Sequence, residues 1–383
     1  MAGLALTYSD EACAAALSDE ALLQAMARFE GALAQASAGA GLVSVQDAAV
    51  IAKTCANATF DASAIALEAR TAGTMVVPFL KQLRAQVAAV SPRAAEQLHA
   101  GATSQDVVDT ALVLCLKPAS TRVLALSAAL GDAAAQLAQR HAGTRCMART
   151  LLQPALPVTF GWKAAVWLSA IARCHGGFRA AAHSVRSLQF GGPEGTLSGL
   201  GAKALQVEAA IAQALGLAVA PTPWHSVRDG FARLGAEAAM LAGTAGTVAR
   251  DISLLMQPEI DELAEPAGAG RGGSSSMPHK RNPAGSLLAL EAALRVPGLA
   301  ATLLNQLGPE LDRGLGQWQS QWMTLRDLLG ATSSALAAMG EVLGGLEVRE
   351  EVMGRNLPPP GDDAAARAMI GRALEAWKAA RAT

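Results

Sequence analysis

Aromatic side chains, cysteine pairs and clustered charge are all scarce in this sequence of 383 residues. Aromatic residues make up 4% of the chain and charged residues 16%, against 51% hydrophobic residues that are largely Ala, Leu and Val. Ala and Leu favour helices, whereas the aromatic and β-branched residues that favour strands are sparse outside a few short runs. The composition therefore predicts a fold of closely packed helices.

The scarcity of clustered charge and of paired cysteines excludes several kinds of partner. The formal net charge is -1 and no Lys/Arg-rich run occurs, so we expect no nucleic-acid partner. The five cysteines are scattered and none forms a CxxC pair, which predicts reduced cysteines in the cytoplasm rather than disulfides. No cluster of His, Cys and Asp has the spacing of metal ligands, and we expect no metal and no organic cofactor.

No segment predicts secretion or membrane insertion. The N-terminus has no basic region before an apolar run. The most apolar segments are interrupted by Glu, Lys, Arg or Gly well short of the ~18 residues that a membrane helix needs. The small residues of 241–248 favour close helix packing, and the competing explanation, a membrane GxxxG dimer, conflicts with Arg250 and Asp251 directly afterwards. We expect no membrane partner.

Apolar positions recur at helical spacing through most of the chain. Short periodic runs, among them 59–67 and 76–90, predict an N-terminal helical domain over 1–105. Five longer segments (about 107–141, 158–188, 226–257, 283–307 and 316–343) predict a central long-helix bundle over 106–345, whose helices bury more than one face, within the chain or against other subunits. The remaining 346–383 contains Pro358-Pro359-Pro360-Gly361 and a short helix over 363–380, too little for an independent domain.

The segment 267–283, AGAGRGGSSSMPHKRNP, predicts a mobile loop that carries many polar side chains. A phosphate-binding loop is one alternative, but the GxxxxGK[ST] spacing and a preceding strand are both missing. A flexible linker is the other alternative, and a linker would not need Met-Pro-His-Lys-Arg-Asn after the serines.

The run GSSSMPHKRNP resembles the GSSxMPxKxNP signature loop of the fumarase/aspartase superfamily. The resemblance implies that Ser274 is the base that removes a proton from the carbon next to a carboxylate. It implies that Lys280 and Asn282 hold that carboxylate as it gains enolate character, and that Ser275 and Met277 contact the substrate. Such an intermediate needs preorganised cations and donors in a dry site, and a serine base needs amide N–H groups near its alkoxide.

A second polar segment, HAGATSQDVVD at 99–109, precedes a long helix and fits a capping role at Thr103 or Ser104. Capping alone is one explanation, and a helix N-terminus also favours anions. The run resembles the HxGxTSxD region of the superfamily. This resemblance implies that His99, Thr103, Ser104 and Gln105 contact the substrate.

A third segment, ARTLLQPALPVTFG at 148–161, resembles the GRTHxQxAxPxTFG region and implies that Thr150 and Gln153 contact the substrate. Leu151 stands where fumarases and adenylosuccinate lyases carry His, and Pro154 stands where a second His is common. Hydroxide and amines are poor leaving groups that need a general acid, whereas a carboxylate leaves without protonation. Leu151 therefore favours a reaction with a carboxylate leaving group, such as lactone opening.

Two further runs carry the resemblance. PWHSVRD at 223–229 implies that His225 and Arg228 contact the substrate, although a lone His here is also typical of a cap or a core. LDRGLGQWQSQW at 311–322 implies that Arg313 binds an extra substrate carboxylate through its planar fork, with a solvated surface Arg as the alternative. Trp318 and Trp322, one helical turn apart, are expected to pack.

The resemblance covers residues 20–356 and is closest to the branch that interconverts a carboxymuconate and its lactone. It implies an all-α, fumarase/aspartase-like long-helix bundle whose central five-helix domain forms the core of a homotetramer, with active sites shared between subunits. The expected substrate is a small polycarboxylate. Two alternatives stay open: a C–N lyase like adenylosuccinate lyase, and a catalytically silent member with a binding or structural role.

Overall fold

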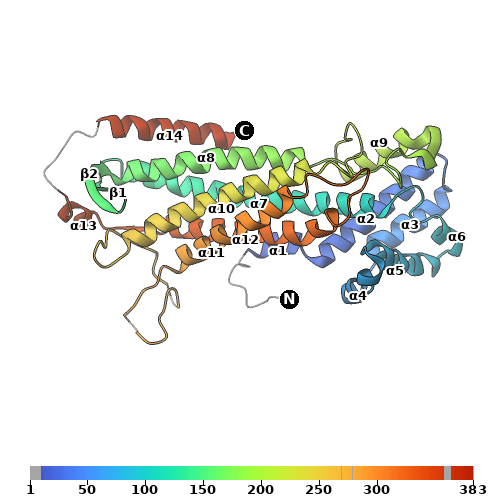
Figure 1. Cartoon of the computed structure of the whole chain (residues 1–383), viewed down its shortest axis with the longest axis horizontal. Helices are drawn as coiled ribbons and strands as arrows, with labels where there is room; N and C mark the ends of the chain where they lie inside the picture. The colour runs from blue at the N-terminus through green and yellow to red at the C-terminus, as the bar shows by residue number, and fades with distance from the viewer. Residues whose placement is uncertain (1–9, 269, 278, 358–363, 383) are drawn as a thin grey trace.

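The computed structural model describes residues 10–268, 270–277, 279–357 and 364–382, and helices dominate this part of the chain, as predicted. The five longest predicted segments are all helices: α7 (Ser104–Arg140), α8 (Phe160–Ser184), α10 (Asp229–Leu255), α11 (Ala284–Leu304) and α12 (Gln321–Gly344). They lie side by side in one elongated bundle (Figure 1). Within it α10 packs against α8, α11 and α12, and α7 packs against α8 and α12.

Most of the remaining elements lie around the two ends of this bundle, whereas α1 and α14 lie along its side (Figure 1). The other helices are α1 (Glu11–Ala16), α2 (Asp19–Gly39), α3 (Val45–Asn57), α4 (Ala62–Ala72), α5 (Val76–Ala88), α6 (Pro92–Glu96), α9 (Ala204–Leu215), α13 (Glu350–Arg355) and α14 (Ala364–Ala382). Strands β1 (Arg145–Thr150) and β2 (Gln153–Thr159) form an antiparallel hairpin, and β3 (Leu263–Ala264) pairs with β4 (Glu347–Val348). Short 3₁₀ segments cover Ser198–Lys203, which is interrupted at Gly201, and Trp318–Ser320.

Polar caps decide where the N-terminal helices begin. The side chains of Asp10, Ser18, Ser44 and Asp61 each accept a hydrogen bond from a backbone N–H three residues further on. The helix that we predicted over 59–67 therefore begins only after Asp61, and it continues to Ala72. The hairpin of β1 and β2, together with α3 and α9, was not predicted. The predicted domain boundaries near residues 105 and 345 stay predictions.

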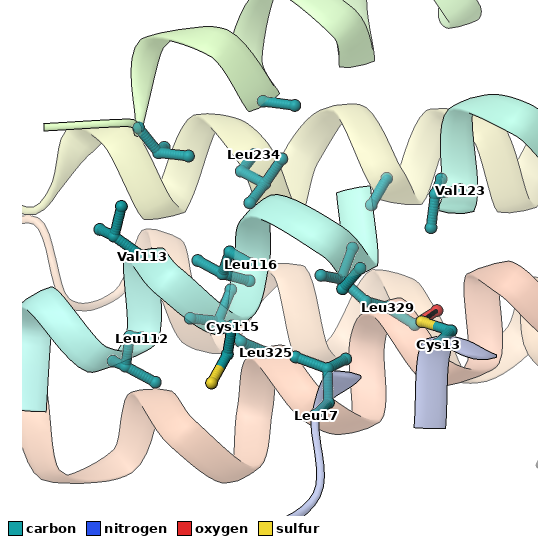
Figure 2. Packing of buried hydrophobic residues seen from close by; sticks show 14 of the residues in the cluster. Cys13, Leu17, Leu112, Val113, Cys115, Leu116, Val123, Leu234, Leu325 and Leu329 are labelled. Atoms are coloured by element: carbon teal, nitrogen blue, oxygen red, sulfur yellow. Dashed lines mark hydrogen bonds between the residues drawn. The ribbon is translucent and has the colours of Figure 1, made fainter. Parts of the chain in front are cut away.

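The core is packed by small and medium-sized side chains, in keeping with the composition. Figure 2 shows Cys13 of the N-terminal segment beside Leu329 of α12, and Leu17 beside Leu325 of the same helix. A Cβ atom added to Gly246 of α10 would lie 2.5 Å from the Cβ atom of Ala293 on α11. The small residues of 241–248 thus allow the close helix approach that we predicted.

Two helices, α7 and α11, are long and apolar enough to cross a membrane by length and composition alone. The apolar stretch of α7 is 67% buried inside the protein, as expected for a core helix, whereas that of α11 is 28% buried. Since core helices of soluble proteins pass the same test, this is weak evidence for a membrane span.

The C-terminal segment returns along the bundle. Helix α14 packs against α8 and α7, where Trp377 is 4% exposed and donates from Nε1 to Oδ1 of Asp132 at 3.0 Å. The predicted terminal helix is therefore present, but its first residue and the preceding Pro358-Pro359-Pro360-Gly361 lie outside the described residues. Within α14, Ile370 and Trp377 are buried, and most of the other residues are exposed.

Candidate functional site

The predicted site residues fall into two groups at opposite ends of the bundle. We call the part of the chain around His99, Thr103, His225 and Arg313 the His99 end. We call the part that holds the β1–β2 hairpin and the loop 267–283 the loop end (Figure 1). Helix α10 connects the two, and its 27 residues span about 40 Å at 1.5 Å per residue.

Asp106 is the centre of the His99 end. Its carboxylate is fully buried, and Oδ1 accepts from the Gly191 N–H at 2.9 Å and lies 2.7 Å from Nε2 of His225. Oδ2 accepts from the N–H groups of Gly192 and Thr103, each at 3.0 Å. Thr103 is the N-cap of α7, as predicted. One carboxylate thus fixes the start of α7, the 191–192 loop and the buried His225, which is 5% exposed.

Arg313 lies beside Thr103, although 210 residues separate them in the sequence. Its NH1 group donates to Oγ1 of Thr103 at 3.1 Å. Its NH2 group donates to the carbonyl oxygens of Gly192 and Pro193 at 3.3 and 3.1 Å. The structure therefore brings the predicted carboxylate-binding cation to the N-terminus of α7, next to predicted site residues Thr103 and Ser104.

Arg228 and Gln105 belong to a buried network rather than to an open surface. Both NH groups of Arg228 donate to the carboxylate of Asp109, at 2.7 and 2.8 Å, and one also donates to Oε1 of Gln321. Nε2 of Gln105 donates to Asp109 and to the carbonyl oxygen of His225, at 3.1 and 2.9 Å. Arg228 and Gln105 are 3% and 1% exposed, so in this chain their donors hold the site together.

His99 pairs with Glu30, a residue that the sequence analysis did not select. Nδ1 of His99 lies 2.6 Å from Oε1 of Glu30, whose side chain is fully buried. Burial opposes protonation of His99, but the hydrogen bond to Glu30 and the charges of Glu30 and Asp106 outweigh it and raise the pKa of the imidazole. The signal for Glu30 in the sequence was a carboxylate on the apolar face of α2, one position after the buried Phe29.

At the loop end, Ser274 accepts hydrogen bonds from the backbone of its own loop. Its Oγ accepts from the N–H of Met277 at 3.1 Å and from that of Ser276 at 3.4 Å. Such amide groups stabilise negative charge on a serine oxygen. Ser274 is half-buried in this chain, whereas Ser275 and Met277 are exposed at its surface.

Lys280 and Asn282 line a pocket of about 730 Å³ at the base of the same loop. Four basic side chains line it (His279, Lys280, Arg281 and Arg349) against one carboxylate, Asp261. Arg349 is paired with Asp261, and Arg281 with Glu347. Among the residues that the structure describes, no hydrogen bond or ion pair is recorded for the Lys280 ammonium, so this pocket favours an anion.

The base of the loop is fixed by hydrogen bonds and by close packing. Glu265, 3% exposed, accepts from the N–H groups of Gly285 and Ser286 at 2.9 and 2.8 Å and so holds the first turn of α11. Gly272 has a φ of 66°, and a Cβ atom there would lie 2.2 Å from the carbonyl oxygen of Asn282. Only glycine fits this crossing of the two arms of the loop.

The hairpin places an apolar tip at the loop end. Thr150 pairs with Gln153 across the strands, and Leu151 and Leu152 form the two-residue turn between them. Their φ angles of 53° and 65° are those of a type I′ turn, which normally carries Asn and Gly. Leu151 is 97% exposed and Leu152 72% exposed. Arg149 anchors the hairpin through two hydrogen bonds to Glu262, at 3.1 and 2.7 Å.

The structure thus groups the site residues but does not unite them in one chain. Thr150, Gln153, Ser274, Lys280 and Asn282 are at the loop end. His99, Thr103, Gln105, His225, Arg228 and Arg313 are at the other end. In the described ranges, no group of three or more His, Cys, Asp or Glu side chains could hold a metal ion.

The chain belongs to the lyase family, which is the fumarase/aspartase superfamily: the family model described as "Lyase" matches residues 7–298. The crystal structure of 3-carboxy-cis,cis-muconate lactonizing enzyme from Pseudomonas putida has a TM-score of 0.92 at 34% identity, and the match covers 98% of each chain. This confirms the predicted family and its all-α fold.

Two curated relatives show the range of activities among similar proteins. A 3-carboxy-cis,cis-muconate cycloisomerase of Bradyrhizobium diazoefficiens is 44% identical over 355 residues, which are 92% of this chain and 78% of the relative. A nitrosuccinate lyase of Streptomyces davaonensis is 39% identical over 355 residues, 91% of this chain and 75% of the relative. These similarities confirm that the chain is an enzyme of this superfamily.

Proposed function

We propose that this enzyme is a 3-carboxy-cis,cis-muconate cycloisomerase, which interconverts its tricarboxylate substrate and a carboxymuconolactone in the β-ketoadipate route of protocatechuate breakdown. The 44% identity with the cycloisomerase of Bradyrhizobium diazoefficiens supports the substrate class. The similarity to the lactonizing enzyme of Pseudomonas putida extends over nearly the whole chain and supports the same reaction.

The main structural support for Ser274 as the catalytic base is the hydrogen bond from the Met277 N–H to its Oγ atom, at 3.1 Å. In the lactone-opening direction, Ser274 as its alkoxide removes a proton from the carbon next to a carboxylate. The electron pair of that C–H bond forms the new double bond, and the ring C–O bond breaks as a carboxylate leaves. No general acid is needed for this leaving group, so Leu151 is compatible with the reaction.

The charges of the two ends suit a substrate with several carboxylates. Lys280 and Asn282 would hold the carboxylate that gains enolate character, beside the basic pocket at the base of the loop. Thr103, Ser104 and Arg313 would bind a second carboxylate at the N-terminus of α7, where the helix dipole also favours an anion. His99, Ser275, Thr150 and Gln153 complete the proposed contacts, and His225, Gln105 and Arg228 support them from the buried network.

The separation of the two ends leads to a proposed assembly, a homotetramer with shared sites. Ends about 40 Å apart along α10 can meet when copies pack side by side with their bundles antiparallel. The face of α11 supports this arrangement, since Leu287, Leu294 and Leu304 are 50%, 80% and 46% exposed in the single chain. The five cysteines of the protein form no disulfide, which also supports the proposed cytoplasmic location.

Turnover of 3-carboxy-cis,cis-muconate, followed by loss of its conjugated-diene absorbance, tests the proposal. The wild-type enzyme is expected to turn over this substrate, and Ser274→Ala is expected to lose about a thousandfold in kcat. Ser276→Ala is the matched control, because it removes a neighbouring hydroxyl and keeps the backbone N–H. Equal rates for Ser274→Ala and the wild type would remove Ser274 from the mechanism.

The second candidate is a C–N lyase, which the 39% identity with a nitrosuccinate lyase favours. Leu151 and Pro154 leave the hairpin without an acid for an amine leaving group. Incubation with adenylosuccinate or nitrosuccinate, with fumarate measured by its absorbance, separates the two candidates. Fumarate release without turnover of the carboxymuconate would favour the lyase.

A further inference from the structure

The His99 end contains two imidazole–carboxylate pairs that differ in how completely they are bonded. In the pair of His225 and Asp106, both carboxylate oxygens are engaged by backbone N–H groups as well as by the imidazole. In the pair of His99 and Glu30, one carboxylate oxygen contacts the imidazole and Oε2 of Glu30 has no partner in the described part of the chain. The carboxylate of Glu30 therefore has fewer hydrogen-bond partners than the carboxylate of Asp106.

Glu30 lies in the protein interior, where burial of a charged carboxylate costs free energy. Its residue is 1% exposed, on the face of α2 that also buries Met26 and Leu33. A buried carboxylate needs a charged or strongly donating partner to offset the loss of water. Among the described residues, His99 is the one side chain that meets this need, at 2.6 Å.

His99 is suited to act between this buried acid and the surface. Its backbone has a φ of 67°, uncommon for a residue with a side chain, and its side chain is 17% exposed. The recorded hydrogen bond of the ring uses Nδ1, so Nε2 is the nitrogen left for a ligand. Thr103, four residues further on, contacts Arg313 and opens α7.

We propose that Glu30 is a positioning residue that keeps His99 an imidazolium, with Nδ1–H bound to Glu30 and Nε2–H free to bind a substrate carboxylate. The inference rests on the proposed function, in which His99 is a substrate contact, and adds the group that fixes its charge and ring orientation. A protonated His99 would be a second cation, beside Arg313, that can bind a substrate carboxylate. The hairpin of this chain, with Leu151 and Pro154, supplies no histidine at those two positions.

Three charged groups act on His99: Glu30 from α2, Asp106 from α7 and Arg84 from α5. Burial and Arg84 lower the pKa of the imidazole, and the two carboxylates raise it above the ordinary 6.5. A histidine with a raised folded-state pKa stabilises the fold fully below pH 6.5, and this contribution is lost as the pH rises through the folded-state pKa. Without Glu30, burial would dominate and the pKa would fall below 6.5.

The dependence of the His99 pKa on Glu30 can be tested without any substrate. The test is an NMR titration of the histidine ring carbons in the whole enzyme, labelled with ¹³C-histidine. His99 is assigned by the signal that disappears in His99→Gln. We expect its midpoint above pH 6.5 in the wild type and below 6.5 in Glu30→Gln. Glu11→Gln, an exposed Glu-to-Gln change, is the matched control and should leave the midpoint unchanged. An equal midpoint in the wild type and Glu30→Gln would overturn the proposal.

The kinetic test uses the same variant. Between the His99 midpoints of the two enzymes, Glu30→Gln is expected to raise KM for 3-carboxy-cis,cis-muconate about tenfold with little change in kcat, because a charge-assisted contact is lost. The difference in KM should shrink as the pH falls below the His99 midpoint measured for the variant, because His99 is then protonated in both enzymes. A KM difference that is constant with pH would indicate a purely structural effect and would contradict the proposal.

Two controls keep the inference separable from folding and from the proposed function. If Glu30→Gln does not fold, the wild-type titration still decides, since a His99 midpoint at or below 6.5 contradicts the proposal. If the wild type does not turn over the carboxymuconate, the proposed function fails while the titration result stands. Glu30→Asp, which keeps the charge, should restore part of the rise in the His99 midpoint.

Discussion

Arg228 and Asp109 form a two-pronged ion pair, with NH1 and NH2 of the guanidinium at 2.7 and 2.8 Å from the two carboxylate oxygens. The side chains are 1% and 0% exposed, and the pair joins the start of α10 to the second turn of α7. Gln105 and Gln321 bond to the same two groups. The two helices that carry the His99 end are therefore joined through one buried charge pair.

Breaking this pair from one side is expected to be costly. Asp109→Asn leaves the buried guanidinium without its charge partner, and the free energy of unfolding should fall by about 3–5 kcal/mol. Urea unfolding at a fixed protein concentration measures it, since the stability of an oligomer depends on concentration. Asp19→Asn, which breaks an exposed pair with Arg326, should cost less than about 1 kcal/mol. Equal losses in the two variants would contradict this account.

The two leucines at the hairpin tip are expected to lower the stability of the fold and to support activity. Replacing Leu151-Leu152 by Asn-Gly suits the positive φ angles and should raise the free energy of unfolding by about 1–2 kcal/mol. If the leucines lie against substrate or another copy, as the shared site requires, kcat/KM should fall in the same variant. Thermal unfolding and steady-state kinetics on one preparation measure both. Unchanged kcat/KM would place the tip outside the active site.

The docking of α14 depends on a glycine of α7. A Cβ atom at Gly131 would lie 2.2 Å from the ring of Trp377, so Gly131→Ala should displace α14 and expose residues 364–382 to proteases. Gly371→Ala is the control, because nothing lies within 4 Å of a Cβ atom there and alanine favours the helix. Limited proteolysis followed by mass spectrometry reports the outcome. Equal resistance of both variants would contradict the packing described.

The cysteines are expected to be chemically inert in the folded enzyme. Burial raises the pKa of the Cys55, Cys115 and Cys146 thiols to about 12 and that of Cys13 to about 11. Only Cys174 is partly exposed among the five. A thiol reagent at pH 8 should therefore modify no more than one of the five quickly, and all of them after denaturation. Rapid reaction of two or more in the folded enzyme would contradict the burial.

Much of the fold could be predicted from the sequence, because long apolar periodicity is a strong signal. The stretch around Leu234, Ala238 and Leu241 predicted α10 to within a few residues at each end. The hairpin was missed for the opposite reason. Its strands are short, and Leu151 and Leu152, both good helix formers, occupy the turn that Asn and Gly usually mark.

The candidate site was predictable by residue type but not by position. The motifs identified Ser274 and Thr103 as polar residues in loops, yet only the direction of α10 shows that they lie at opposite ends of one chain. Glu30 carried no motif, since a single carboxylate within a helix is usually solvated. Its role depends on His99, 69 residues later, and such a long-range contact cannot be predicted from local periodicity.

Subunit complementation tests the central claim, that the loop of one copy completes the His99 end of another. Ser274→Ala and Arg313→Gln should each be inactive alone. After unfolding together and refolding at equal amounts, about a quarter of the sites should combine an intact loop with an intact His99 end, and activity should return to that level. Native mass spectrometry verifies that mixed assemblies form. Mixed assemblies without any recovered turnover would contradict the shared site.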